Sequence, residues 1–212
     1  MAPHETAPGR IGRHLVRALD ARLRRAQGTF VFSDDPDCIL RLSLITAQAP
    51  LRFNNGAAVA PGDQLIVIHF WNERLPAVPA EGPDLRWART MIRQSVASLR
   101  LLAQYLESRP DLAGVRAIGS DVAGFLTVSE LDTGAVFPRL GFEMQRPLAS
   151  AGPWQRFLGF WEGVYSWLLV WTYNPATLRG KAPWSLERFG MWMPRTTLEA
   201  RYGHGAAERG GT

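Results

Sequence analysis

The stretch DLRWARTMIRQSVASLRLLAQYLESR, residues 84–109, has the clearest periodicity in this chain. Its apolar residues recur at intervals of three and four, the spacing that places them on one face of an α-helix. Asp84 precedes the repeat and is a favourable N-cap, whereas Pro110 follows it and cannot continue a helix. The pattern predicts a long amphipathic helix whose core-facing residues are Ala88, Met91, Ile92, Val96, Leu99, Leu102, Ala103 and Leu106.

Strand signals precede this helix. Residues 38–47, CILRLSLITA, alternate with the period of two that is typical of a strand with one buried face. The turn signals NNG and PGD then separate two short segments from GDQLIVIHFWNERLP, residues 62–76, which contains a longer apolar run. Residues 38–72 are therefore predicted to form three or four antiparallel strands in a meander.

Strand signals also follow the helix. Residues 114–128, GVRAIGSDVAGFLTV, are apolar but interrupted by glycine, and Phe142 and Met144 lie where a last short strand is expected. Strands grouped before a helix, with further strands after it, favour an α+β fold. We expect a mostly antiparallel sheet covered by the long helix, with an N-terminal amphipathic helix and a C-terminal Trp-rich helical extension.

The composition is that of a globular protein with one main domain. The 212 residues are 46% hydrophobic and 20% charged, which allows a sizeable core. The net charge of +5 comes from arginine, since Lys181 is the only lysine among 24 basic residues, and it favours anionic partners in general. Cys38 is the only cysteine, so the sequence offers no disulfide framework and no cysteine metal site.

The N-terminal sequence favours a cytoplasmic protein. Arg13, His14 and Arg17 interrupt the apolar run that a secretory signal would need. Residues 10–26, RIGRHLVRALDARLRRA, place apolar residues four apart with arginines on the other faces, which predicts an amphipathic basic helix. Such a helix can pack on the domain, contact an anionic membrane or bind nucleic acid, and the sequence leaves these alternatives open.

The C-terminal part of the chain is rich in tryptophan. Residues 154–174, WQRFLGFWEGVYSWLLVWTYN, carry four of the eight tryptophans, and their apolar part, 157–171, is shorter than the roughly 20 residues of a spanning helix. This segment can form a buried helix, an in-plane helix at a membrane or a partner, or a membrane span. The residues predicted to contact a membrane or a partner are Trp154, Phe157, Phe160, Trp161, Trp167, Leu168 and Trp171.

These observations predict four segments along the chain. Residues 1–29 are expected to contain the basic N-terminal helix, and residues 30–152 the α+β domain. Residues 153–202 are expected to form the Trp-rich helical extension. Residues 203–212 have no apolar residues apart from alanine and are expected to form a disordered tail.

Three polar residues near the end of the 62–76 stretch are candidate catalytic residues, namely His69, Asn72 and Arg74. A histidine near the end of a strand can act as a general base, because its unperturbed pKa is about 6.5. In a regular strand His69 and Asn72 point to opposite faces, so they converge only through a bulge or if the strand ends near Phe70. The alternative is a structural His69 that hydrogen-bonds to the backbone or to Asn72.

Other kinds of site have no support in the sequence. The chain lacks the G-x-S-x-G, P-loop and G-x-G-x-x-G motifs, so we do not expect a serine hydrolase, a P-loop nucleotide-binding protein or a Rossmann-type dinucleotide-binding protein. Its four histidines lie on different predicted elements without ligand spacing. We therefore predict no metal site and no cofactor.

The segments LRFNNGAAVAPGDQLIVIHFWNERLP, SLRLLAQYL and RLGFE together resemble the YkoP-like family of bacterial proteins, over roughly residues 38–145. The shared features are a turn with glycine and aspartate, an apolar strand that ends in I-H-x-x-N, and a later L-G-F. In this chain they are Gly62, Asp63, Ile68, His69, Asn72 and Leu140–Phe142. The family is associated with polysaccharide deacetylases and envelope glycan or lipid genes, so the resemblance implies an envelope-related role and assigns no catalytic residue.

The segment AVFPRLGFE, residues 135–143, is also similar to the end of the GCN5-related N-acetyltransferase fold. Those enzymes hold the acyl-CoA pyrophosphate with backbone N–H groups at a helix start of pattern [RQ]-x-x-G-x-[GA]. Here RQSVAS, residues 93–98, lacks the glycine that permits close approach, and Pro138 interrupts the helix that should lead into the L-G-F turn. The similarity implies an acyltransferase-like enzyme with a degenerate acyl-CoA site.

Taken with the Trp-rich segment, the envelope association favours a membrane- or complex-associated accessory protein in bacterial envelope glycan or lipid metabolism. We expect it to be cytoplasmic and peripheral to the inner membrane, with a membrane surface or a membrane protein as partner and no nucleic acid. The alternative is the acyltransferase-like enzyme.

Overall fold

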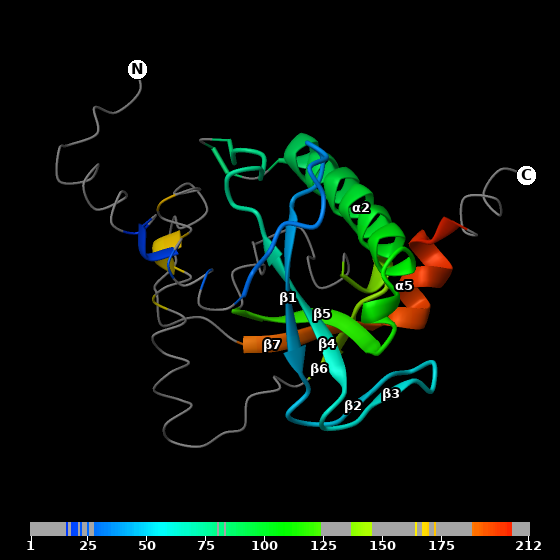
Figure 1. The fold of residues 1–212 in the computed structure, drawn as a ribbon. Coiled ribbons are helices and arrows are strands. Elements are labelled where there is room, and N and C mark those ends of the chain that lie inside the picture. The colour runs from blue at the N-terminus through cyan, green and yellow to red at the C-terminus, as the bar shows by residue number, and fades with distance from the viewer. Residues whose placement is uncertain are drawn as a thin grey trace, which may run out of the picture.

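The computed structural model contains a five-stranded sheet that one long helix crosses (Figure 1). The strands of this sheet run in the order β1-β4-β5-β7-β6, and two further strands, β2 and β3, form a separate hairpin. The structure describes residues 16, 18–20, 22, 25, 28–79, 81–82, 84–123, 137–145, 164, 167–169, 172 and 188–204. The strands are β1 (Leu40–Thr46), β2 (Leu51–Arg52), β3 (Ala58–Val59), β4 (Gln64–Phe70), β5 (Val115–Ala123), β6 (Glu143–Gln145) and β7 (Arg188–Pro194).

The five-stranded sheet is mixed. β4 and β5 are parallel, whereas the other three neighbouring pairs are antiparallel. The helix α2 (Leu85–Glu107) lies between β4 and β5 in the chain and is the crossover that parallel strands require. A short helix η1 (Pro110–Leu112) leads into β5, and α5 (Arg195–Tyr202) follows β7 directly. The fold is therefore α+β, and its mixed sheet contains one parallel pair among three antiparallel ones.

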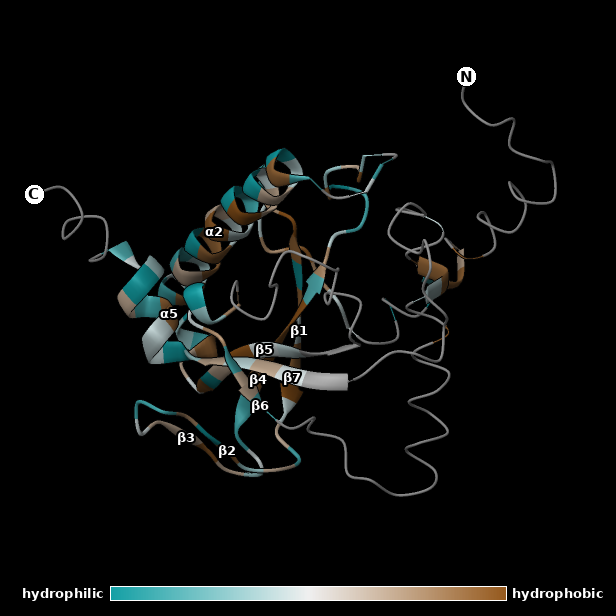
Figure 2. Cartoon of the chain, turned by 180° about the vertical axis from the view of Figure 1, so that it is seen from behind, coloured by the Kyte–Doolittle hydropathy of each residue, from teal (hydrophilic) through white to brown (hydrophobic). Residues whose placement is uncertain are grey.

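The helix α2 confirms the element predicted from residues 84–109. Asp84 is its N-cap, and the Asp84 carboxylate accepts a hydrogen bond of 2.7 Å from the backbone N–H of Trp87. Figure 2 shows that α2 carries both hydrophilic and hydrophobic residues in alternating bands, as an amphipathic helix does. All of its buried residues lie at or after Ser98, and they are Ser98, Leu99, Leu102, Ala103 and Leu106. In the N-terminal half of the predicted apolar face, Met91 and Val96 are partly buried against the core, whereas Ile92 is 41% exposed.

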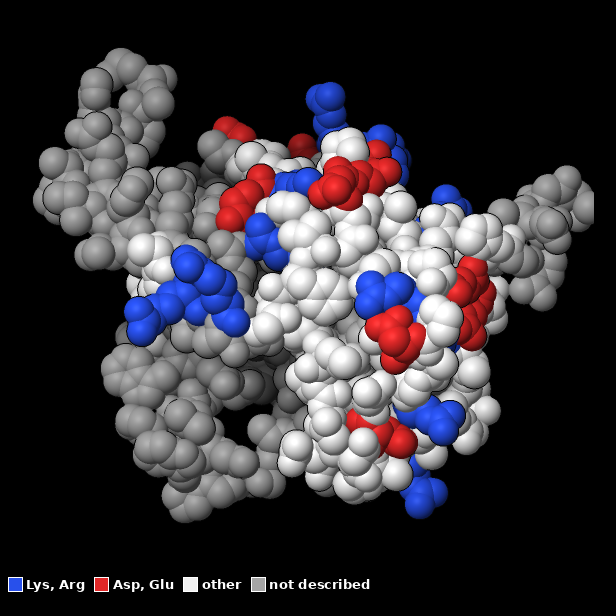
Figure 3. Space-filling model, viewed as in Figure 1, with Lys and Arg blue, Asp and Glu red and all other residues white. Residues whose placement is uncertain are grey.

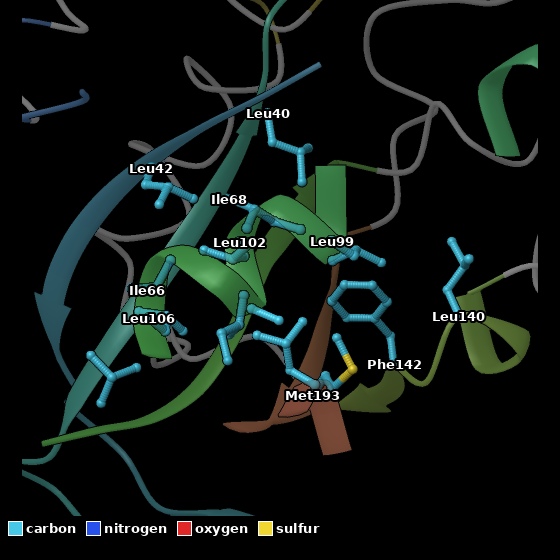
Figure 4. Close-up of a cluster of buried hydrophobic side chains, with 14 of the residues drawn as sticks. Leu40, Leu42, Ile66, Ile68, Leu99, Leu102, Leu106, Leu140, Phe142 and Met193 are labelled. Atoms are coloured by element: carbon cyan, nitrogen blue, oxygen red, sulfur yellow. The ribbon is translucent and has the colours of Figure 1, made fainter. Parts of the chain in front are cut away.

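The main core lies between α2 and one face of the sheet. Leu42 on β1 pairs with Ile68 on β4, and both side chains belong to the same buried cluster as Leu102. The apolar side chains of α2 point toward those of β1 and β4 in Figure 4, with Phe142 and Met193 completing the cluster. Because side chains alternate along a strand, Arg41, Ser43, Val67 and His69 lie on the opposite face.

A second apolar cluster covers part of that opposite face. The β2–β3 hairpin supplies Phe53 and Val59, which pack with Leu65, Ala117 and Trp192 of the sheet. Trp192 is 1% exposed. The hairpin therefore covers the end of the sheet at which β4 begins.

The pairing of the first four strands differs from the predicted meander. β1 pairs directly with β4, from Leu40 opposite Phe70 to Thr46 opposite Gln64, and β2 and β3 pair only with each other. Turn signals indicate where a chain reverses, but partner choice depends on which faces pack on the core, and this is a non-local property.

The last part of the expected helical extension contains a strand. Residues 188–194, placed in a helical extension, form β7, which lies between β5 and β6 in the centre of the sheet. β6 confirms the short strand expected near Met144, although it is not the last one. Met191, Trp192 and Met193 are all buried, so β7 has two buried faces and lacks the alternation that would have marked it as a strand.

Candidate functional site

The two parallel strands separate at their carboxyl ends. β4 pairs with β5 from Gln64 opposite Val115 to Val67 opposite Gly119, and the described residues beyond this point do not pair across the two strands. Residues 68–70 of β4 continue to pair with β1, whereas residues 120–123 of β5 continue to pair with β7. Figure 1 shows β4 and β5 diverging from this point. Ligands commonly bind at the carboxyl ends of parallel strands, so this fork is the candidate functional site.

Close packing at Gly119 marks the start of the fork. An added Cβ at this residue would lie 2.2 Å from the Met191 carbonyl oxygen and 2.7 Å from the Trp192 indole ring. The indole therefore lies directly against the Gly119 backbone. At the other end of this pairing the register shifts between Gln64 and Leu65, where Arg116 of β5 is the extra residue.

His69 lies on the part of β4 beyond the fork and forms a hydrogen bond with Ser43 of β1. The distance between Ser43 Oγ and His69 Nε2 is 2.9 Å, and Ser43 is 3% exposed. Burial lowers the pKa of the His69 imidazole below its ordinary value, so the ring is neutral at neutral pH. Either tautomer can form this bond, and Nδ1 forms no hydrogen bond to a described residue. The arrangement suits a proton acceptor whose orientation is set by a neighbouring hydroxyl.

Arg74 is part of an arginine–tryptophan cluster at the end of β4. Its guanidinium lies 3.7 Å from the centroid of the Trp71 ring and donates a hydrogen bond of 3.3 Å to the Cys38 carbonyl oxygen. Arg41 lies 4.2 Å from the same ring centroid and 3.7 Å from the Glu73 carboxylate. Arg74 therefore fastens the turn after β4 to the segment before β1, which is a structural role.

Asn72 is not brought to His69. The backbone N–H of Trp71 still bonds to the Ile39 carbonyl oxygen, so the ladder with the β1 side extends to Trp71, and a turn begins at Asn72. Among the described residues, the Asn72 side chain has no hydrogen bond to His69 or Arg74. Of the three candidate catalytic residues, His69 is the one that the described structure joins to Ser43 by a hydrogen bond.

Sequence reasoning did not identify Ser43 and Gly119 as site residues. Ser43 lies two residues from Arg41 in a strand that alternates regularly, and its approach to His69 follows only from the β1–β4 register, with Ser43 opposite Val67. In the sequence, Gly119 was interpreted as an interruption of a strand, whereas β5 (Val115–Ala123) includes it without a break. Both roles depend on which strand lies alongside.

Most of the predicted Trp-rich contact residues lie outside the described residues, namely Trp154, Phe157, Phe160, Trp161 and Trp171. The described Trp167 and Leu168 are helical and half-buried, and Trp167 Nε1 is buried without a hydrogen-bond partner in the described part of the chain. No helix within the described ranges is both long enough and apolar enough to cross a membrane. The same ranges contain no group of three or more His, Cys, Asp or Glu side chains that could hold a metal ion.

Comparison with known proteins identifies the family. A family model described as the YkoP domain matches residues 33–202, which include all the described strands and helix α5. A comparison with curated proteins and one with solved structures each found no match. The similarity to GCN5-related N-acetyltransferases has no support from these comparisons. Because the match covers more than half of the chain, this protein belongs to the YkoP domain family.

Proposed function

We propose that the fork between β4 and β5 binds a small thioester with an extended, amide-containing arm, so that the protein is acyltransferase-like. The observation that carries this proposal is the end of β4–β5 pairing after Val67 and Gly119. An extended chain with alternating N–H and C=O groups can hydrogen-bond to the edge of a strand. An acyl-pantetheine has amides of this kind next to its thioester.

The start of α2 favours a ligand without a pyrophosphate. RQSVAS, residues 93–98, lies in the middle of α2, where backbone N–H groups are used within the helix. At the true start of the helix, the Asp84 carboxylate accepts from the Trp87 N–H and adds a negative charge that repels a phosphate. The proposed ligand is therefore the thioester arm alone, which is consistent with a degenerate acyl-CoA site.

His69 supplies the chemistry in this proposal. An amine or hydroxyl of the acceptor attacks the thioester carbonyl carbon, and neutral His69 accepts the proton that the attacking group loses. The C–S bond breaks, the sulfur leaves as a thiolate, and the proton on His69 passes to it to give the free thiol. Burial lowers the pKa of His69 and keeps the ring in the neutral form that this step needs. The hydrogen bond with Ser43 holds the ring in place, and in the tautomer whose Nε2 donates to Ser43 Oγ, Nδ1 has the lone pair that accepts this proton.

Amide chemical shifts would test the binding step. On titration with S-acetylpantetheine, we expect saturable shifts for residues 68–70 and 120–123, and equal or weaker binding of acetyl-CoA.

Thiol release in the presence of amine acceptors would then report acyl transfer. His69→Gln should lower its rate about 10²–10⁴-fold at unchanged affinity. Asn72→Ala is the matched control and should retain the rate. Absence of saturable shifts, or shifts confined to residues outside the fork, would overturn the proposal.

A second candidate function is attachment to a membrane surface, in the envelope glycan or lipid metabolism that the resemblance implies. The observation that favours it is the described part of the N-terminal segment, where Leu19 is 45% exposed and Arg22 and Arg25 are exposed. Figure 3 shows basic side chains gathered on this segment, at the left of the view. Exposed leucine beside arginine is typical of helices that lie in a lipid interface.

Cell fractionation would test this attachment. We expect the full chain to sediment with membranes and to be released by a high-salt wash, as a peripheral protein would be. Recovery of the whole chain as a soluble monomer at low salt would contradict it.

A further inference from the structure

The N-terminal half of α2 carries no buried side chain. Residues 85–97 are all half-buried or exposed, with Met91 and Val96 half-buried against the core, whereas every fully buried residue of the helix lies at or after Ser98. Ser98 Oγ accepts a hydrogen bond of 2.9 Å from the Ile39 N–H, and Ile39 lies beside the carboxyl end of β4. The first half of α2 is therefore less buried than the second half. Asp84 caps it, and Trp87 Nε1 fastens it to the Pro76 carbonyl oxygen at 3.1 Å.

Four arginines form a row along the outer side of α2. At 100° per residue, Arg86, Arg89, Arg93 and Arg100 fall within a sector of about 60°, and at 1.5 Å per residue the row is about 21 Å long. All four are exposed, and none forms an ion pair with a described residue. α2 has no acidic residue before Glu107. The row is a continuous positive strip that lies away from the buried face.

Two exposed apolar side chains lie next to this row. Leu85 is 65% exposed and Ile92 is 41% exposed, which are high values for residues of this type on a folded protein. They are seven residues apart and so lie one above the other on the helix. Arginines beside exposed Leu and Ile are the composition of a helix that lies in a lipid headgroup layer.

We propose that the arginine row, with Leu85 and Ile92, is the surface by which this protein docks on an anionic lipid bilayer. The inference rests on the second proposed function, attachment to a membrane surface, and adds a contact surface on α2 to the N-terminal segment. Lipid is favoured over nucleic acid because the apolar pair can enter the acyl boundary. A single-stranded nucleic acid would instead need aromatic side chains for base stacking, and the row has none.

Vesicle flotation of the full chain would test the proposal. Binding to vesicles of phosphatidylcholine alone would be compared with binding to vesicles in which about 30 mole per cent of the lipid is phosphatidylglycerol. The row variant is Arg86→Gln, Arg89→Gln and Arg93→Gln together. The matched control is Arg52→Gln, Arg116→Gln and Arg139→Gln, which removes the same charge from exposed positions elsewhere. We expect the row variant to bind anionic vesicles on the order of 100-fold more weakly, and the control to change little.

The outcomes separate this inference from the proposed function. If the wild-type chain floats and the row variant floats equally well, the docking surface is elsewhere and only this inference fails. Equal weakening in both variants would show that net charge alone acts, which also overturns it. No flotation of the wild-type chain would remove both. Row-dependent binding to single-stranded DNA tighter than to anionic vesicles would overturn the choice of lipid. Single Arg89→Gln, checked by circular dichroism, keeps the test valid if the triple variant folds poorly.

Discussion

Gly119 is packed so closely that β5 has no room for a side chain at this position. In Gly119→Ala, the new Cβ would lie 2.2 Å from the Met191 carbonyl oxygen, and backbone cannot yield as a flexible side chain can. We expect a loss of about 1–3 kcal/mol or more in the free energy of unfolding, measured by urea denaturation. Gly114→Ala is the control, since its Cβ meets only the end of the Gln64 side chain, at 2.9 Å. Equal stability of the two variants would contradict this packing.

Burial of His69 makes stability depend on pH. Burial lowers the pKa of His69 in the folded state below the value of about 6.5 in the unfolded chain. Below that pH the unfolded chain binds the extra proton, so the contribution is fully present above about 6.5 and is lost as pH falls through the folded pKa. We expect the free energy of unfolding to fall by at most about 1.4 kcal/mol per pH unit from this one group.

Denaturation of His69→Gln at several pH values isolates this term. The glutamine keeps a polar partner for Ser43 but does not titrate, so the difference between wild type and variant should change with pH only below about 6.5. A difference that stays constant from pH 7.5 to 5.0, a range of about 2.5 units that spans the histidine reference value, would mean that His69 is not buried in a neutral form.

At the scale of elements, Ser98 joins α2 to the segment before β1. Its side chain is fully buried, accepts from the Ile39 N–H at 2.9 Å and donates to the Gln94 carbonyl oxygen at 2.8 Å. Ser98→Ala leaves a buried backbone N–H without its partner, and we expect the free energy of unfolding to fall by about 1–3 kcal/mol. Ser108→Ala, at an exposed serine of the same helix, should change it by less than about 0.5 kcal/mol. Thermal denaturation of both variants provides the comparison.

At the scale of the whole molecule, the sheet depends on its last strand. β7 lies between β5 and β6, and β7 with α5 supplies the fully buried Met193 and Leu198. A chain that ends at residue 187 would expose the edge of β5 and leave β6 without β7, its partner among the described strands. We expect this truncated chain to lose the cooperative unfolding transition seen by circular dichroism. A chain that ends at residue 204 keeps every described element and should unfold like the full chain. A folded 1–187 fragment would show that β7 is dispensable.

Local sequence patterns were sufficient to predict the elements that depend on interactions between residues close together in the chain. The helix over residues 84–109 was predictable because its 3.6-residue period and its Asp84 cap are both properties of neighbouring residues. The strand over residues 64–70 and the presence of His69 near its end were equally visible. The YkoP resemblance, carried by motif order, is confirmed by the family match.

Only the tertiary structure decided which strands and side chains lie next to each other. The parallel pairing of β4 and β5, the place of β7 between β5 and β6, and the Ser43–His69 bond all join residues far apart in the chain. Their pairing depends on which faces are buried together, and a residue has no local signal for the strand that will lie next to it. The sequence therefore determined the helix, most of the strands and the basic, arginine-rich surface charge. The fork between β4 and β5 depends on tertiary pairing, because β4 stays with β1 and β5 stays with β7 beyond Val67 and Gly119.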